Sequence, residues 1–149
     1  MREQDITSLN IDTSEFEKLK ISAVAIVLFD KDGRVFLKQR KKDSETALIS
    51  GVGRLHEEPD NPDKAILGEV FHSIGLNVPL ARMFVDTGSN QNIGVYAGFV
   101  ENSKAALGVA GNSIGRKWVD LEKAVGTELY KGQEKYIKRV WGMINKNAQ

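Results

Sequence analysis

The stretch RLHEEPDNPDKAILGEVFHSIGL, residues 54–76, joins a polar loop to a helix with recognisable ends. Asn61 or Asp60 can cap the helix, and Pro62 suits its first position. Gly75 is suited to end it in the left-handed backbone region. Between these ends the apolar residues recur at helical spacing and predict one buried stripe, formed by Ile66, Leu67, Val70, Phe71 and Ile74. The sequence therefore predicts a helix over residues 62–74.

Three chemically active residues share another face of this helix. Glu69, His72 and Ser73 stand at i, i+3 and i+4, which places them together on a helix. Because this face lies away from the predicted stripe, we expect all three to point to solvent or into a cleft. His72 suits a metal ligand, a proton carrier or a plain surface residue. His56, in the preceding loop, could meet His72 in a transition-metal site, and the spacing does not decide between these roles.

Strand patterns flank the predicted helix. Residues 21–29, ISAVAIVLF, are rich in Val and Ile, a turn follows at Asp30–Gly33, and residues 34–40 alternate, so the two segments predict a hairpin. Residues 41–62 predict a long loop, whereas 81–88, 92–100 and 115–121 predict further strands. Residues 127–146 predict an amphipathic C-terminal helix. Strands interleaved with two main helices favour an α/β or α+β sandwich.

Composition limits the classes of partner. The 149 residues include 21 basic and 20 acidic side chains, so the net charge of +1 favours neither nucleic acid nor an anionic membrane. The most apolar run, residues 21–29, is too short to cross a bilayer as a helix. The chain has no cysteine and begins without a signal-peptide pattern, so we expect a cytoplasmic protein. We predict an N-terminal extension over residues 1–19 and a single domain over 20–149.

Residues 54–76 resemble the Nudix box, G-x5-E-x7-R-E-U-x-E-E-x-G-U, where U is a bulky apolar residue, without any gap. Four positions match, namely Glu69, Val70, Gly75 and Leu76. Asp60 is a conservative change, and four positions depart from the box, namely Arg54, Gly68, His72 and Ser73. The Gly-rich residues 50–60 and the Trp-bearing segment 115–124 are also similar to the family. The resemblance covers about residues 20–146 and implies a Nudix-type α/β/α sandwich with a mixed sheet.

The family's chemistry depends on the positions that depart. Nudix hydrolases (MutT-like proteins) cleave nucleoside diphosphate derivatives with Mg²⁺ or Mn²⁺, held by three glutamates on one helix face. By this resemblance Glu69 is the catalytic candidate and main metal ligand, with weak help from Glu57 or Asp60. His72 and Ser73 stand where the other two glutamates would be, and neither supplies a carboxylate. The resemblance assigns phosphate binding to Arg40. From their chemistry, Arg54 and His72 are further ligand-binding candidates, although Arg54 could instead fill the space of metal and substrate.

Further departures suggest that the whole site has changed. Gly68 cannot pair with Asp60 as the box arginine pairs with its acid, and the loop 108–115 contains no acidic residue. We therefore expect a protein directed at nucleotide-like small molecules, with weakened or lost magnesium-dependent hydrolysis. An active hydrolase with an altered Mg²⁺ or Mn²⁺ site is the alternative, and a scaffold for protein interactions without a small ligand is another. The sequence leaves the enzyme question open and allows a homodimer.

Overall fold

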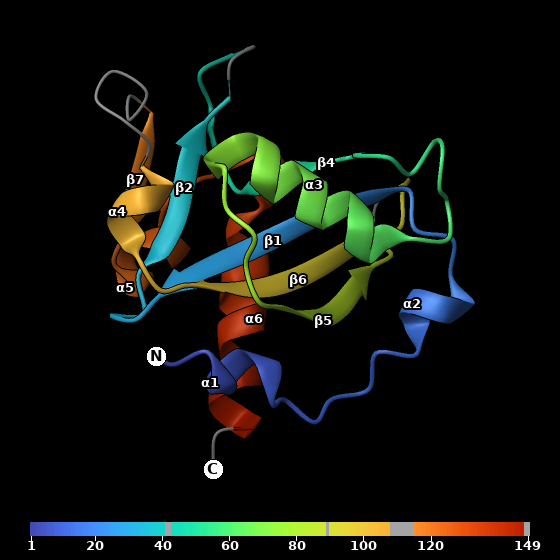
Figure 1. The fold of residues 1–149 in the computed structure, drawn as a ribbon, viewed down its shortest axis with the longest axis horizontal. Coiled ribbons are helices and arrows are strands. Elements are labelled where there is room, and N and C mark those ends of the chain that lie inside the picture. The colour runs from blue at the N-terminus through green and yellow to red at the C-terminus, as the bar shows by residue number, and fades with distance from the viewer. Residues whose placement is uncertain (41–42, 89, 108–114, 148–149) are drawn as a thin grey trace.

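The computed structural model describes residues 1–40, 43–88, 90–107 and 115–147. Within these residues a mixed sheet of seven strands is packed between helices (Figure 1). Its strands are β1 (Ala23–Asp30), β2 (Val35–Gln39), β3 (Thr46–Ala47), β4 (Ile49–Gly51), β5 (Leu80–Asp86), β6 (Ile93–Val100) and β7 (Arg116–Val119). The helices are α1 (Gln4–Thr7), α2 (Glu15–Lys18), α3 (Pro62–Ile74), α4 (Ser103–Ala106), α5 (Leu121–Val125), the 3-10 turn η1 (Tyr130–Gly132) and α6 (Glu134–Asn147).

Strand β1 is the centre of the sheet. It runs parallel to β6 along its whole length, and it pairs antiparallel with β2 and β4. The sheet continues as β3-β2-β1-β6-β5, with β7 paired to β2. The predicted hairpin is confirmed, since Phe29 in β1 lies opposite Val35 in β2. Its turn ends at Gly33, whose φ of 75° suits glycine.

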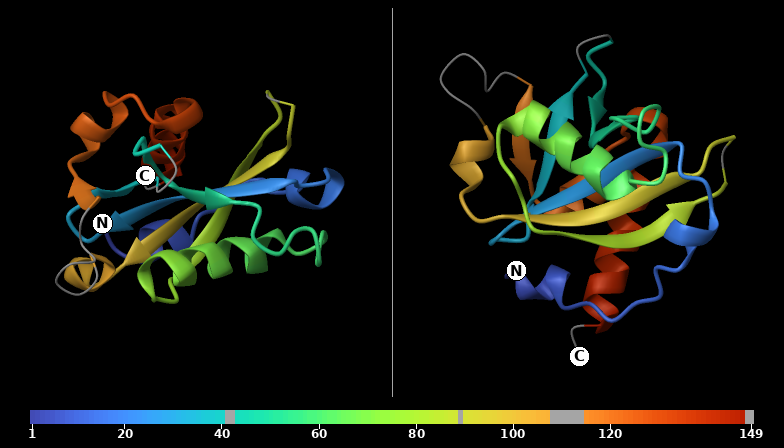
Figure 2. Two further views of the ribbon diagram at one scale, coloured as in Figure 1. Left: turned by 90° about the horizontal axis from the view of Figure 1, so that it is seen from above. Right: turned by 45° about the vertical axis from the view of Figure 1, so that its right-hand side comes forward.

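The alternation of β1 produces two cores. Val24, Ile26 and Leu28 pack on the α3 side, whereas Ala25, Val27 and Phe29 pack on the α6 side. Figure 2 shows α3 and α6 on opposite faces of the sheet. The predicted α/β/α sandwich with a mixed sheet is thus confirmed. No helix among the described residues is long and apolar enough to cross a bilayer.

Helix α3 has the predicted bounds and the predicted ends. The Asn61 side chain accepts a hydrogen bond from the Lys64 amide at 3.2 Å, and Gly75 ends the helix with a φ of 71°. Asp63 in the first turn accepts hydrogen bonds from the Tyr96 hydroxyl at 2.5 Å and from Arg82 Nε at 2.8 Å. These two contacts fix the start of the helix to β6 and β5.

The predicted apolar stripe of α3 is confirmed at Ile66, Val70 and Ile74 but is wrong at Leu67 and Phe71. Phe71 is 54% exposed and Leu67 is only half-buried, whereas Ser73 is 8% exposed. The side that faces the sheet carries Ala65, Ile66, Val70, Ser73 and Ile74. The apolar pattern predicted burial of both Val70 and Phe71, but successive residues point about 100° apart around a helix, so Phe71 faces away from the sheet.

Two other boundaries differ from expectation. The predicted loop of residues 41–62 contains the short strands β3 and β4, which complete the sheet beside β2 and β1. The C-terminal helix is confirmed but begins at Glu134 rather than near residue 127. Lys131 and Gly132 have φ values of 51° and 72°, and a right-handed helix cannot continue through left-handed residues. Lys41, Lys42 and the acid-free loop at 108–114 lie outside the described residues.

Candidate functional site

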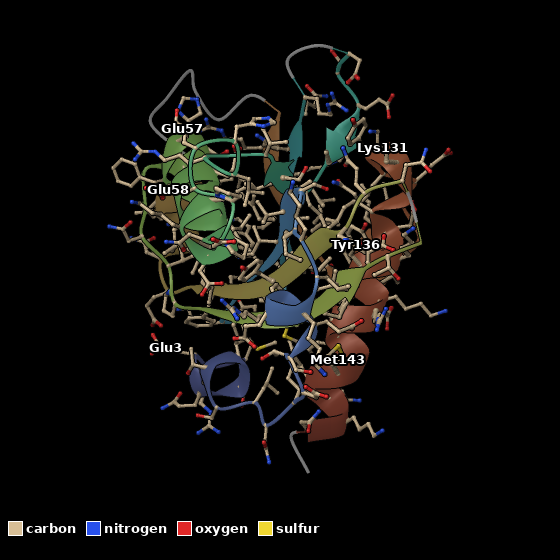
Figure 3. All side chains as sticks on the ribbon, turned by 90° about the vertical axis from the view of Figure 1, so that its right-hand side faces the viewer. Glu3, Glu57, Glu58, Lys131, Tyr136 and Met143 are labelled. Atoms are coloured by element: carbon tan, nitrogen blue, oxygen red, sulfur yellow. The ribbon has the colours of Figure 1, made fainter. Side chains whose placement is uncertain are left out.

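A cavity of about 600 Å³ opens between the amino ends of β1 and β6, strand β4, the end of β5 and the start of α6. We call it the sheet pocket. Its polar and aromatic wall includes Ser50, Asp86, Tyr130, Lys131, Lys135 and Tyr136. Lys131 and Tyr136 lie on the α6 side of the molecule, as Figure 3 shows. A cavity of this size, with an apolar floor and a few polar groups, has the general form of a small-molecule site.

Gln133 fixes the wall of the sheet pocket. Its side chain is 5% exposed, accepts a hydrogen bond from the Leu48 amide at 2.9 Å, and donates one to Ser50 Oγ at 3.1 Å. These bonds join the segment before α6 to β4 and the residue that precedes it. The pocket therefore has a preformed shape, because both ends of this buried amide are satisfied.

Asp86 contributes a carboxylate to the pocket, whose lining also contains Lys131 and Lys135. Its carboxylate accepts hydrogen bonds from the Tyr136 hydroxyl at 2.5 Å and from the Gly88 amide at 2.9 Å, and Lys135 Nζ lies 3.6 Å away. Burial opposes ionisation of Asp86, but the bonds from Tyr136 and Gly88 together with the positive charge of Lys135 outweigh it, so the pKa of Asp86 is lowered. Burial and the bond to Asp86 raise the pKa of Tyr136 above its ordinary value. Asp86 is therefore held ionised, with Lys135 as its counter-charge.

Arg40 contacts Tyr130, a residue that lines the sheet pocket. Its guanidinium carbon is 3.4 Å from the centroid of the Tyr130 ring, and Nη1 is 3.8 Å from the Asp43 carboxylate. Arg40 Nη1 is buried and has no hydrogen-bond partner in the described part of the chain. A buried donor of this kind is suited to an incoming oxygen ligand, and arginine matches phosphate geometry well.

A second depression of about 760 Å³, the outer groove, runs along the solvent side of α3. It is lined by Arg54, Leu67, Glu69, Phe71 and His72, with Gly68 between them. The structure therefore places Arg54 and His72 together in this groove, which Arg40 does not line. His56 and His72 are both exposed, and His56 does not line the groove.

Glu69 lies between the two cavities. Its side chain lines the outer groove, and its carboxyl group packs against Gly51, which lines the sheet pocket. A Cβ atom added at Gly51 would lie only 2.8 Å from Cδ of Glu69. Glycine at this position therefore allows the carboxylate of α3 to reach the edge of the sheet pocket.

Ser73 does not face solvent, which corrects the sequence expectation. It is buried, and its Oγ accepts a hydrogen bond from Lys38 Nζ at 3.3 Å. Lys38 extends from β2 on the face that also carries Phe36, toward α3. The alternation of Val35 and Leu37 with Phe36 and Lys38 contained this signal, although nothing in the sequence indicated Ser73 as the partner.

The donor set does not fit a divalent metal. The structure of the described residues contains no group of three histidine, cysteine, aspartate or glutamate side chains able to hold one. Glu57 and Asp60, predicted to assist Glu69, are both exposed. Figure 3 shows Glu57 and Glu58 on the α3 side, and Glu58 forms an ion pair with Lys64 at 3.0 Å. On the face of α3 that carries Glu69, His72 and Ser73, Glu69 thus supplies the carboxylate, and Ser73 is hydrogen-bonded to the Lys38 ammonium group.

Sequence reasoning missed most of the sheet pocket. Asp86, Tyr130, Gln133 and Tyr136 come from the end of β5 and from the segment around η1, far from the box helix in the chain. The long-range pairing of β1 with β4 and β6 brings their neighbours together. No local pattern marks such residues, because each one separately resembles an ordinary turn or helix residue.

Comparison with known proteins relates the chain to others through structure. No protein-family model and no curated protein sequence matches it. A mutT/nudix family protein from Listeria innocua aligns with a TM-score of 0.69 at 12% identity, over 83% of this chain and 93% of that one. The NUDIX domain of Shewanella oneidensis NrtR, complexed with ADP ribose, aligns at 0.63 and 16%, over 89% and 93%. The Ap4A hydrolase of C. elegans aligns at 0.59 and 14%, over 85% and 99%. The predicted resemblance is confirmed at the level of architecture, and the chain has the Nudix fold.

Proposed function

We propose that this chain binds a nucleoside diphosphate-type ligand and hydrolyses it weakly or not at all. The observation that carries the proposal is the junction at Gly51, where the sheet pocket meets the Glu69 face of α3. A nucleoside would occupy the sheet pocket, whose volume of about 600 Å³ suits a ligand of that size. Its phosphates would lie toward the pocket rim, near Arg40 and Glu69.

Three features support this ligand class. Arg40 Nη1 is buried without a hydrogen-bond partner among the described residues, with the Asp43 carboxylate 3.8 Å away, and the guanidinium group stacks on Tyr130, which lines the sheet pocket. The carboxylate of Asp86 is held ionised and can accept hydrogen bonds from sugar hydroxyls or a base amine. A protein of the same fold, the NrtR NUDIX domain, is complexed with ADP ribose.

Weak hydrolysis follows from the charge of α3. Metal-assisted cleavage of a diphosphate needs several hard oxygen ligands around the cation. The α3 face offers the Glu69 carboxylate, while Ser73 contributes a neutral hydroxyl that already accepts from Lys38. Glu69 remains our candidate for any residual catalysis; Glu57 and Asp60 are exposed, and the described residues form no group of three metal-ligating side chains.

Calorimetric titration with ADP-ribose, ADP and ATP tests the proposal, together with turnover assays in Mg²⁺ and Mn²⁺. We expect binding of at least one nucleoside diphosphate derivative, and loss of about tenfold or more in affinity when Tyr130→Ala removes the ring beneath Arg40. Glu122→Gln, at an exposed position of α5, should leave binding unchanged, and it is the matched control for Glu69→Gln because each removes one carboxylate charge.

The outcomes separate the alternatives. Efficient turnover that Glu69→Gln abolishes would establish an active hydrolase and contradict the weak-hydrolysis part of the proposal. Absence of binding by every nucleotide tested would contradict the ligand assignment and favour a scaffold role.

A further inference from the structure

Lys38, on strand β2, brings a positive charge to the side of α3 that faces the sheet. Its Nζ donates to Ser73 Oγ at 3.3 Å, and Ser73 is 8% exposed. Ser73 lies one helical turn after Glu69, and residues four apart on a helix have Cβ atoms about 6 Å apart. The ammonium group therefore lies beside a residue one helical turn after Glu69, on the same side of α3.

The chemistry of this ammonium group opposes a divalent cation. An ammonium group is a donor only, so it cannot serve as a metal ligand, and its charge repels a cation held nearby. A serine hydroxyl that accepts from the ammonium directs a lone pair toward Nζ rather than toward a metal. A carboxylate placed at position 73 would meet the same ammonium first and form an ion pair with it.

We propose that the Lys38 ammonium replaces the divalent cation at this face of α3, so that the site carries a built-in positive charge and takes phosphate-bearing ligands without metal. A lysine ammonium is an effective phosphate-binding point charge. The exclusion of the divalent cation depends on Lys38, Ser73 and Glu69 alone, whereas the binding of a phosphate-bearing ligand rests on the proposed function.

The first experiment uses Mn²⁺ alone, measured by electron paramagnetic resonance, on four proteins: wild type, Lys38→Met, Ser73→Glu and Lys38→Met with Ser73→Glu. We expect the double variant to bind Mn²⁺ about tenfold or more tightly than either single variant, because only it has two carboxylates and no ammonium group. If Ser73→Glu alone produces the whole gain, or the double variant gains nothing, Lys38 does not control the metal and the proposal is wrong.

Folding must be shown to survive these changes, since Ser73 is buried. Methionine matches the length of the lysine stem, and thermal unfolding of each variant provides the check. Where glutamate is not accommodated, the shorter Ser73→Asp, alone and with Lys38→Met, repeats the cycle with the same expected and contrary results. Lys123→Met, at an exposed position of α5, is the control for loss of one positive charge and should leave Mn²⁺ binding unchanged.

The second experiment uses ADP-ribose as the probe, in EDTA and in Mg²⁺. We expect equal affinity in both, a decrease of about tenfold in Lys38→Met, and recovery in Lys38→Arg, which keeps the charge. Binding that requires Mg²⁺ would overturn the inference while the proposed ligand class stands. Failure of ADP-ribose and the other nucleotides to bind at all would contradict the proposed function, and the Mn²⁺ cycle would still decide the role of Lys38.

Discussion

Gly53 and Gly68, at and within α3, differ in the space that a side chain would find. At Gly53 the backbone has a φ of 51°, and an added Cβ atom would lie 2.8 Å from the carbonyl oxygen of Ala65. At Gly68, within α3, an added Cβ atom would meet nothing within 4 Å. The first glycine lets the loop approach the helix, whereas the second gives the helix no packing advantage.

These two positions give opposite predictions for alanine. Gly53→Ala should lower the free energy of unfolding by about 1–3 kcal/mol, because it combines strain with a collision. Gly68→Ala should raise it by about 1 kcal/mol, because alanine favours the helix and has open space. Urea denaturation measures both, and Gly142→Ala, in an equally open position of α6, is the control expected to follow Gly68→Ala. A stabilising Gly53→Ala would contradict this account.

The position of Lys38 also belongs at the scale of single residues. Alternation along β2 places it on the α3 side, so a charged residue arrives where the neighbouring residue of that face, Phe36, is fully buried. Lys38 is half-buried, and the Ser73 hydroxyl is one acceptor for its ammonium group. Ser73 on the helix and Lys38 on the strand therefore form one hydrogen-bonded pair.

Among the elements, α6 and β5 are joined by the pair of Tyr136 and Asp86. The hydrogen bond from Tyr136 contributes to the lowered pKa of Asp86, against the opposing effect of burial. A folded-state pKa below the unfolded value stabilises the protein above the unfolded pKa, near 3.9 for aspartate, and this contribution is lost as the pH falls through the folded pKa.

Tyr136→Phe should therefore destabilise the protein more at pH 7 than at pH 3 or below. The expected loss at pH 7 is about 1–2 kcal/mol, the typical net value of a hydrogen bond to a charged group. Chemical denaturation across this pH range measures the difference. In an Asp86→Asn background the same change should lose most of its pH dependence; an unchanged dependence there would show that Asp86 is not the partner responsible.

At the scale of the whole molecule, the N-terminal segment contributes to both cores. Ile6 is fully buried on the α6 side, and Phe16 packs edge-on against Tyr96 on the α3 side, with ring centroids 5.3 Å apart. Glu17 adds an ion pair with Arg82 at 3.1 Å. In Figure 1 this blue segment runs beneath the sheet from α1, beside α6, to α2 at the end of β5.

The boundary predicted after residue 19 can be tested on this basis. Deletion of residues 1–19 should lower the midpoint of thermal unfolding, because it uncovers apolar surface of both cores. Ile6→Ala alone should cost about 2–5 kcal/mol, the usual range for a large-to-small core change. Asn10→Ala, at an exposed position, should have little effect. Unchanged stability after the deletion would show that residues 20–149 fold independently of the extension.

The outline of the fold could be predicted because its signals are local. The helix of residues 62–74 has a capping asparagine and a terminating glycine, and both act within one turn of the chain. The β1–β2 hairpin depends on a short turn with glycine at its end. Strands β3 and β4 escaped prediction because strands of two and three residues are too short for a pattern of alternation.

The candidate site was predicted on α3, in the loop before it and at Arg40, but not elsewhere in the sheet pocket. Glu69, Arg54 and His72 follow from the spacing of the box, and the structure places all three along the outer groove. The sheet pocket depends on residues from β5, η1 and α6, whose meeting is a property of the sheet order. Arg40 was predicted from the resemblance, but its stacking on Tyr130 required the structure.

By itself, the sequence determined the α3 helix with its ends, the hairpin, the sandwich class and the presence of His72 and Ser73 one turn after Glu69. Only the tertiary structure decided which way these two side chains point: His72 to the exposed side, and Ser73 inward to Lys38. The reason is physical. Caps, turns and periodicity depend on neighbours along the chain, whereas the burial of Ser73 and its contact with Lys38 depend on how the sheet places β2 relative to α3.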